Sequence, residues 1–178
     1  MPRISLIDEK ERPELAGLIE KIRSGRRGNL LKLYRVLLHS PSLAESWFGH
    51  NNAVRWRTRI GGRLREMVII RIAILNQAQY IITQHVPKLA AAEGLSEAEC
   101  DALVDWQNSD LFGEAERAVL AYADAMTRDV RVSDEVYAQV RRHFDERQTV
   151  ELTVLIGTYN MQSRVIQALQ LEPESDRR

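Results

Sequence analysis

"GGRLREMVIIRIAILNQAQYIITQHVPKLAAAEGLSEAE" spans residues 61–99, and its pattern decides the fold class of this chain of 178 residues. The run Arg63–Leu75 is apolar on almost every face, which is typical of a helix buried in a protein core. A second helix is expected over Ala78–Glu93, with Gly94 as its C-terminal stop. Ser96–Glu99 has the S-x-x-E form of a capping box, so another helix should begin there.

Helical periodicity also dominates the flanking segments, and no run shows sustained strand alternation. Helices are expected over about 12–23, 30–38, 43–57, 96–106, 112–129, 133–145 and 146–170. The sequence therefore predicts an all-α protein of about eight to nine helices, arranged as a single domain over residues 1–178.

Composition and charge exclude several classes of function. Lys and Arg number 25, as do Asp and Glu, so the strong basic excess of a general nucleic-acid binder is missing. The longest apolar run, "MVIIRIAIL", is too short to span a bilayer and contains Arg71. The N-terminal "MPRISLIDEK" lacks the apolar region of a signal peptide. We therefore expect a cytoplasmic protein with no membrane or nucleic-acid partner, and its single cysteine, Cys100, fits a reducing compartment.

Two residues of the quoted stretch have the chemistry of a candidate catalytic pair. Glu66 lies in the apolar helix, where a carboxylate either points to solvent or needs a buried partner. His85 lies on the next helix, and a carboxylate that orients an imidazole makes a general acid–base group near neutral pH. The alternatives are a structural His85 and an ion pair of Glu66 with an arginine. The basic run 55–65 is either a solvated linker or the source of an arginine that pairs with a substrate carboxylate or a neighbouring subunit.

The stretch resembles the core of the carboxymuconolactone decarboxylase family, whose superfamily includes AhpD-like proteins. The resemblance rests on "L-R-E" at the start of the central helix, on Tyr80, on His85 and on the ending "AAAEGLS". Downstream, "FGEAERAVLAYADAMTRDVRVSDEVYAQVRRHF" and "ELTVLIGTYNMQSRVIQAL" resemble the rest of the longer members, so the similarity covers about residues 30–170. It implies an AhpD-like helical fold that assembles into homo-dimers, trimers or hexamers, with sites near the subunit contacts.

The chain departs from both branches of that family. The AhpD-like branch has the spacing E-x11-C-x2-C-x3-H; counted from Glu66, its two cysteines fall on Ala78 and Ile81 and its histidine on His85. A thiol peroxidase needs a thiolate nucleophile, so that mechanism is not expected here, and Cys100 lies in the next helix.

The non-redox branch usually reads "Y-E-W-x-x-H", where this chain has Tyr80-Ile81-Ile82-Thr83-Gln84-His85. Two isoleucines thus replace a glutamate and a tryptophan. The change is either natural to this chain or engineered, and both origins remain open. An apolar lining without that carboxylate should favour the neutral form of His85.

The resemblance and the residues together predict acid–base chemistry, a proton transfer or decarboxylation, on a small carboxylated or carbonyl substrate. His85 would be the acid–base group and Glu66 would orient it, while Tyr80 and an arginine position the substrate in a pocket lined by Ile81, Ile82 and Trp47. Such an enzyme would be a carboxy-lyase, and no pattern calls for a metal or an organic cofactor. The alternatives are a catalytically impaired or engineered member with an apolar ligand pocket and, third, an AhpD-like antioxidant peroxidase.

Overall fold

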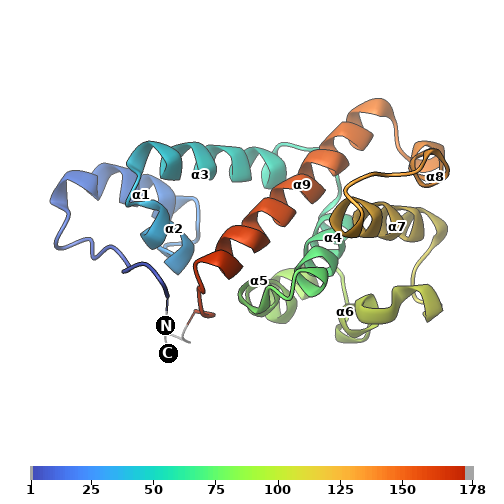
Figure 1. The fold of residues 1–178 in the computed structure, drawn as a ribbon, viewed down its shortest axis with the longest axis horizontal. Helices are drawn as coiled ribbons and strands as arrows, with labels where there is room; N and C mark the ends of the chain where they lie inside the picture. Colours follow the sequence, from blue (N-terminus) through green and yellow to red (C-terminus); the bar gives the residue numbers. More distant parts are fainter. Residues whose placement is uncertain (1, 175–178) are drawn as a thin grey trace.

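The computed structural model describes residues 2–174, apart from the side chain of Pro87, and every regular element in that range is helical (Figure 1). The all-α prediction is therefore confirmed. The α-helices of the described chain are α1 (Ala16–Ser24), α2 (Lys32–Leu37), α3 (Pro41–Trp56), α4 (Gly62–Leu75), α5 (Gln79–His85), α6 (Glu97–Ala102), α7 (Glu114–Arg128), α8 (Asp134–His143) and α9 (Glu146–Ala168). Short 3-10 segments precede α1 at Pro13–Leu15 and follow α6 at Leu103–Asn108.

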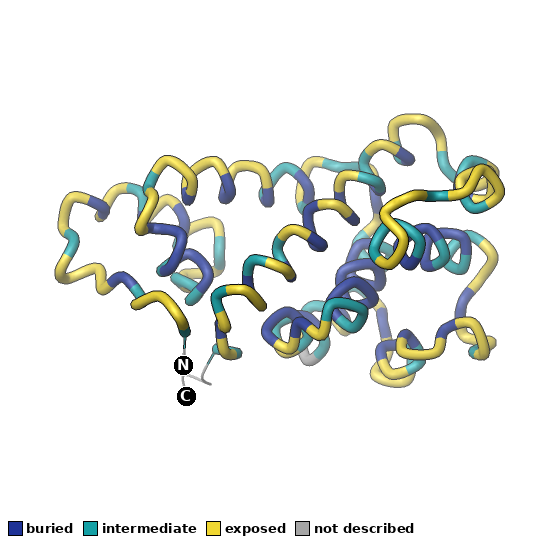
Figure 2. The backbone as a smooth tube through the Cα atoms, in the orientation of Figure 1, coloured by how far each residue is buried: buried dark blue, intermediate teal, exposed yellow. Residues whose placement is uncertain are grey.

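Helix α4 is the buried centre of the molecule, as its apolar sequence predicts. It packs against α5, α7 and α9, and it is buried along almost its whole length (Figure 2). One side of α4 faces the main core, to which α1, α2, α3, α5, α7, α8 and α9 also contribute. The other side contributes Met67 and Ile70 to a second apolar cluster with α7 and the segment around α6. A helix covered on both sides has to be apolar all round.

The one charge inside the apolar run of α4 is satisfied by a buried partner. Arg71 is only 1% exposed. It donates from Nε and Nη2 to the two carboxylate oxygens of Asp124 on α7, each at 2.6 Å, and from Nη1 to the carbonyl of Leu103 at 2.7 Å. This bidentate ion pair joins α4 to α7 without leaving the guanidinium unpaired.

The predicted helix over 78–93 is only partly correct. Helix α5 ends at His85, and a π-helical turn, η2 (Val86–Ala90), follows it. The physical reason is Pro87, which has no backbone N–H and removes one donor from the regular α-helical pattern. The local end signals are confirmed: Gly94 has a φ of +82°, and Ser96 with Glu99 forms a complete capping box.

The chain after α9 returns to the N-terminal part of the molecule. The backbone N–H of Arg3 donates to the carbonyl of Leu169 at 3.0 Å, and Glu174 reaches the start of α2. The end of α9 and the segment after it thus lie beside Arg3 and the start of α2 (Figure 1). Within the described range, no helix combines the length and apolar character needed to cross a bilayer.

Candidate active site

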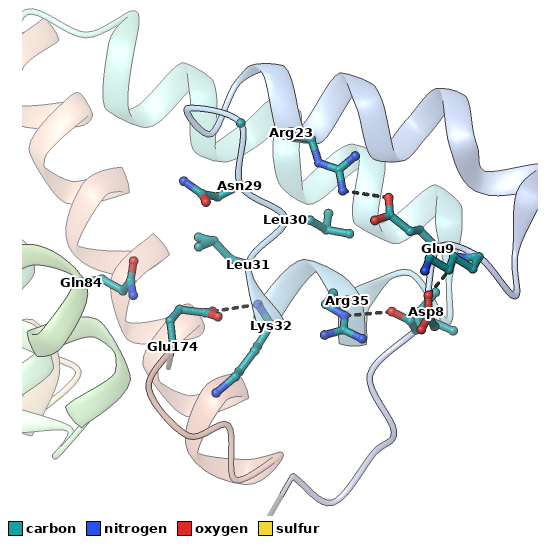
Figure 3. Close-up of a pocket in the computed structure, with 13 residues that line it drawn as sticks. Asp8, Glu9, Arg23, Asn29, Leu30, Leu31, Lys32, Arg35, Gln84 and Glu174 are labelled. Atoms are coloured by element: carbon teal, nitrogen blue, oxygen red, sulfur yellow. Dashed lines mark hydrogen bonds and ion pairs between the residues drawn. The ribbon is translucent and has the colours of Figure 1, made fainter. Parts of the chain in front are cut away.

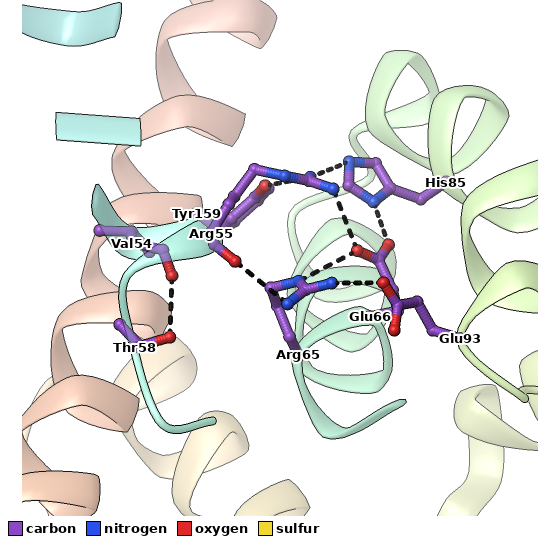
Figure 4. A network of polar contacts seen from close by, with 8 residues as sticks. All are labelled: Val54, Arg55, Thr58, Arg65, Glu66, His85, Glu93 and Tyr159. Atoms are coloured by element: carbon purple, nitrogen blue, oxygen red, sulfur yellow. Dashed lines mark hydrogen bonds and ion pairs between the residues drawn. The ribbon is translucent and has the colours of Figure 1, made fainter. Parts of the chain in front are cut away.

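Helices α4 and α5 bring Glu66 and His85 into direct contact. The Nδ1 atom of His85 lies 2.5 Å from Oε2 of Glu66, and both side chains are buried (Figure 4). The two residues lie on consecutive helices, so they can touch only if these helices pack side by side. Helices α4 and α5 do pack against each other. A carboxylate at this distance fixes the orientation of the imidazole ring.

Two arginines complete a buried polar network around this pair. Arg55, from α3, donates from Nη2 to Oε1 of Glu66 at 3.2 Å and from Nη1 to the hydroxyl of Tyr159 at 2.9 Å. Arg65 donates from Nε to the same Glu66 oxygen at 3.4 Å and from Nη2 to Glu93 at 2.7 Å. Two cations therefore face two carboxylates, and the network is electrically balanced when His85 is neutral (Figure 4).

The contacts of His85 define its tautomer. Nη1 of Arg55 lies 3.5 Å from Nε2, and a guanidinium can only donate. Nε2 is therefore the acceptor, so Nδ1 carries the hydrogen and donates it to Glu66. This leaves a lone pair on Nε2, which is the feature that a general base requires.

Electrostatics favours the neutral imidazole next to a charged carboxylate. Burial lowers the pKa of His85 below its ordinary 6.5, and the positive charges of Arg55 and Arg65 lower it further, whereas Glu66 acts in the opposite direction. Burial alone would raise the pKa of Glu66, but the hydrogen bond from His85 and the two arginines outweigh it and hold that pKa below the ordinary range. The direction for His85 agrees with the sequence-based expectation, although two arginines contribute to it as well as apolar surroundings.

Two aromatic side chains border the network. Tyr159, from α9, is buried and meets the imidazole of His85 edge to face, with ring centroids 5.9 Å apart. Trp56, at the end of α3, lies over the guanidiniums of both Arg55 and Arg65, each 4.9 Å from the ring centroid. Trp56 is 53% exposed, so it forms the solvent side of the network.

The other residues predicted to bind substrate lie outside this network. The Tyr80 hydroxyl donates to Glu174 and accepts from the backbone N–H of Leu33. Ile81 is 1% exposed in the main core, Ile82 packs against that core, and Trp47 is buried within it. The indole N–H of Trp47 has no hydrogen-bond partner within the described residues.

Sequence reasoning missed three members of the network: Arg55, Arg65 and Tyr159 were not predicted as site residues. The basic run 55–65 was the available signal, and its description as a solvated linker is wrong for Arg55, Arg63 and Arg65. Arg63 pairs with Glu99 and Glu116 rather than with Glu66.

The single cysteine of the chain is not placed as a reactive thiol. Cys100 is buried in the second apolar cluster, and burial raises the pKa of its thiol. A buried thiol with a raised pKa is a poor nucleophile. In the described part of the chain, no three His, Cys, Asp or Glu side chains are grouped to hold a metal ion.

The chain is similar to a known protein family and to two bacterial proteins. Residues 41–125 match the model of the "Carboxymuconolactone decarboxylase family". The uncharacterized protein YdfG of Bacillus subtilis (strain 168) is 31% identical over 111 residues, which cover 61% of this chain and 75% of YdfG. The uncharacterized protein YnjA of Escherichia coli (strain K12) is 31% identical over 118 residues, 66% of this chain and 64% of YnjA.

Solved structures share the fold. A protein of unknown function from Agrobacterium tumefaciens, suggested to be the antioxidant defence protein AhpD, is similar with a TM-score of 0.73 and 25% identity, covering 79% of this chain and 96% of that one. A variant of the debrominase Bmp8, in complex with 2,3,4-tribromopyrrole, superposes with a TM-score of 0.81 over 97% of this chain and 91% of its own. Its identity is 20%, so this likeness concerns the fold alone.

Proposed function

Because the chain belongs to the carboxymuconolactone decarboxylase family, within the AhpD-like superfamily, we propose that it catalyses acid–base chemistry on a small carboxylated or carbonyl substrate. His85 is the acid–base group and Glu66 is the positioning residue that holds its ring and stabilises its protonated form. Arg55 binds the substrate carboxylate, a role that the sequence left to an unspecified arginine. The reaction is a proton transfer or a decarboxylation.

One observation carries this proposal: the lone pair of His85 Nε2 is turned toward a cation. Arg55 approaches Nε2 at 3.5 Å, which is the outer limit of a hydrogen bond and therefore weak. A substrate carboxylate would form a stronger, charge-assisted contact with the same guanidinium. Binding of the substrate would then draw Arg55 away from Nε2 and place the reacting carbon beside the freed base.

The proton and the electrons balance without another reactant. In a proton transfer, Nε2 removes a proton from the carbon beside the substrate carbonyl, leaving an enolate and an imidazolium, and the imidazolium returns the proton to the product. In a decarboxylation, the bond to the carboxylate carbon breaks, carbon dioxide leaves, and its bonding electrons stay on the substrate. A proton taken up from solvent at Nε2 of His85 is passed to the substrate carbon that had carried the carboxylate, and His85 returns to its neutral form.

An activity screen tests the assignment. The chain is assayed on 4-carboxymuconolactone and on a panel of β-keto and lactone acids, beside His85→Ala and the control His143→Ala. His143 is exposed on α8 and contacts none of the network residues. We expect His85→Ala to reduce turnover by about 10²-fold or more, the usual contribution of a general acid–base group. Turnover that survives His85→Ala would contradict the proposal.

A catalytically impaired binding protein is the second candidate, and the burial of Ile81 favours it. Ile81 is 1% exposed and packs in the core. The family resemblance implies a glutamate at this position in the non-redox branch, so this chain lacks that carboxylate. The double change Ile81→Glu, Ile82→Trp decides between the two. If only the changed and still folded chain turns over, the protein is a remodelled form of the enzyme; if the chain as it stands turns over, the isoleucines belong to a working site.

Family membership also supports self-association. We propose a homo-oligomer of two, three or six copies, with a small-molecule substrate as the other partner. Sedimentation velocity counts the subunits, and a monomer at micromolar concentration would contradict this part of the proposal.

A further inference from the structure

A carboxylate from the segment after α9, that of Glu174, is bound at a second polar site, on the face of α5 that carries Tyr80. Oε1 of Glu174 accepts a hydrogen bond from the backbone N–H of Lys32 at 2.8 Å (Figure 3). The same oxygen accepts another from the hydroxyl of Tyr80. Tyr80 is 3% exposed, and its hydroxyl oxygen accepts from the backbone N–H of Leu33 at 3.4 Å. That contact leaves the single hydroxyl hydrogen free to point at the carboxylate.

A cavity of about 670 Å³ adjoins this carboxylate. Its walls are the N-terminal residues 7–10, Arg23, the loop and first turn at 28–32, Arg35 and Gln84, with Glu174 beside them (Figure 3). The volume is within the range of small-molecule sites, about 300–1,000 Å³. The cavity is thus large enough for a ligand that is considerably larger than one carboxylate.

The cavity wall also carries positive charge with unused hydrogen-bonding capacity. Arg35 donates from Nε to the carbonyl of Ile7 at 2.9 Å, and within residues 2–174 no carboxylate lies at ion-pair distance from it. The ammonium of Lys32 is held by backbone carbonyls of Pro173 and Glu172, at 2.5 and 3.4 Å. A second acidic group on a ligand would therefore meet Arg35.

The way in which Glu174 is held makes it replaceable. It belongs to a short segment beyond α9, and its own side chain is half-buried rather than enclosed. A group that binds from a short linker within the same chain acts at a finite effective concentration, of the order of millimolar. A free carboxylate at a comparable concentration can compete with it, whereas the buried Tyr80 hydroxyl needs an acceptor in either state.

We propose that this cavity binds a small organic dicarboxylate, one end of which takes the place of Glu174 on Tyr80 and Lys32 while the other reaches Arg35. Glu174 is then a built-in competitor that keeps the site satisfied when no ligand is present. This site is separate from the acid–base network of His85 and does not depend on the function proposed for that network.

Succinate is the probe, and the full chain is compared with Glu174→Gln and Asp8→Asn. Both variants remove one negative charge from the cavity wall, but Asp8 accepts from the backbone of Lys10 and not from Tyr80. Calorimetry measures the affinity, and the amide resonance of Lys32 reports on the contact itself. Succinamide, which has the same shape without charge, is the control ligand.

We expect Glu174→Gln to bind succinate at least about fivefold more tightly than the full chain, because the competitor is gone. Its Lys32 amide resonance should shift, and succinate should move it back toward the wild-type position. Adding Tyr80→Phe to Glu174→Gln should then weaken succinate binding about tenfold or more, as expected for the loss of a hydrogen bond to a charged group. Equal affinities of wild type and Glu174→Gln, an equal gain with Asp8→Asn, or binding of succinamide would each overturn the proposal.

Discussion

Replacing Glu66 by glutamine removes the one carboxylate that contacts both arginines and His85. The change keeps the shape of the side chain and takes away its charge. Arg55 loses its only carboxylate contact in the described part of the chain, whereas Arg65 retains Glu93. The three charged groups that remain in the network, Arg55, Arg65 and Glu93, then sum to one positive charge, and both arginine side chains are largely buried.

The expected loss of stability follows from this geometry. Removing one partner of a buried ion pair costs about 3–5 kcal/mol, and the lower end, about 3 kcal/mol, applies because glutamine still offers an oxygen to Arg55. For a chain of this length, each kcal/mol lowers the melting temperature by about 2–4 °C. Glu66→Gln should therefore melt about 6–12 °C below the wild type. The pKa of His85 should fall further, since Glu66 is the group that raises it.

Thermal unfolding followed by circular dichroism measures the first effect, and an NMR titration of the His85 ring measures the second. Asp124→Asn is the matched control, because it breaks a largely buried pair with Arg71, and neither residue of that pair contacts the imidazole of His85. The control should lose comparable stability and leave the titration of His85 unchanged. A Glu66→Gln variant that melts within about 2 °C of wild type, or whose His85 pKa rises, would refute the reasoning.

Three further predictions concern pH, the cysteine and a helix cap. Folding holds the pKa of His85 below 6.5, so the unfolded chain binds more protons at this residue than the folded chain does. The free energy of unfolding should therefore decrease as pH falls through 6.5. Urea titrations at several pH values should show this decrease in the wild type and not in His85→Gln. Cys100→Ser should leave peroxide consumption with a dithiol donor at the wild-type level, and a loss of activity would revive the peroxidase hypothesis. Ser96→Ala should reduce the free energy of unfolding in urea by about 1 kcal/mol, because the Ser96 side chain caps α6. Ser42→Ala should leave that free energy unchanged, because the Ser42 side chain caps no helix.

The sequence predicted correctly those parts of the fold that depend on residues adjacent along the chain. The apolar run of α4, the stop at Gly94 and the capping box at Ser96 each follow from a few consecutive residues. The π-helical turn after His85 was missed, because a widened turn of five residues hardly changes the periodicity of apolar positions.

The candidate site shows the limit of such reasoning. Glu66 and His85 were predicted because both lie in the stretch that carries the family resemblance. The contact between Arg55 and Tyr159 joins residues 104 positions apart, and it exists only because α3 and α9 pack together. No local pattern encodes that packing, just as none indicates that Glu174 meets Tyr80 across 94 positions.

The place of Trp56 gives this protein an optical reporter of its own. Of the three tryptophans, Trp47 and Trp106 are buried, whereas Trp56 is exposed and stacks on two guanidiniums. An indole in water emits at longer wavelength than one in a hydrocarbon core, so the red edge of the fluorescence spectrum belongs mainly to Trp56. Any compound that draws Arg55 away should change that emission. Ligands of the His85 network can therefore be sought by fluorescence before a reaction or a product is known.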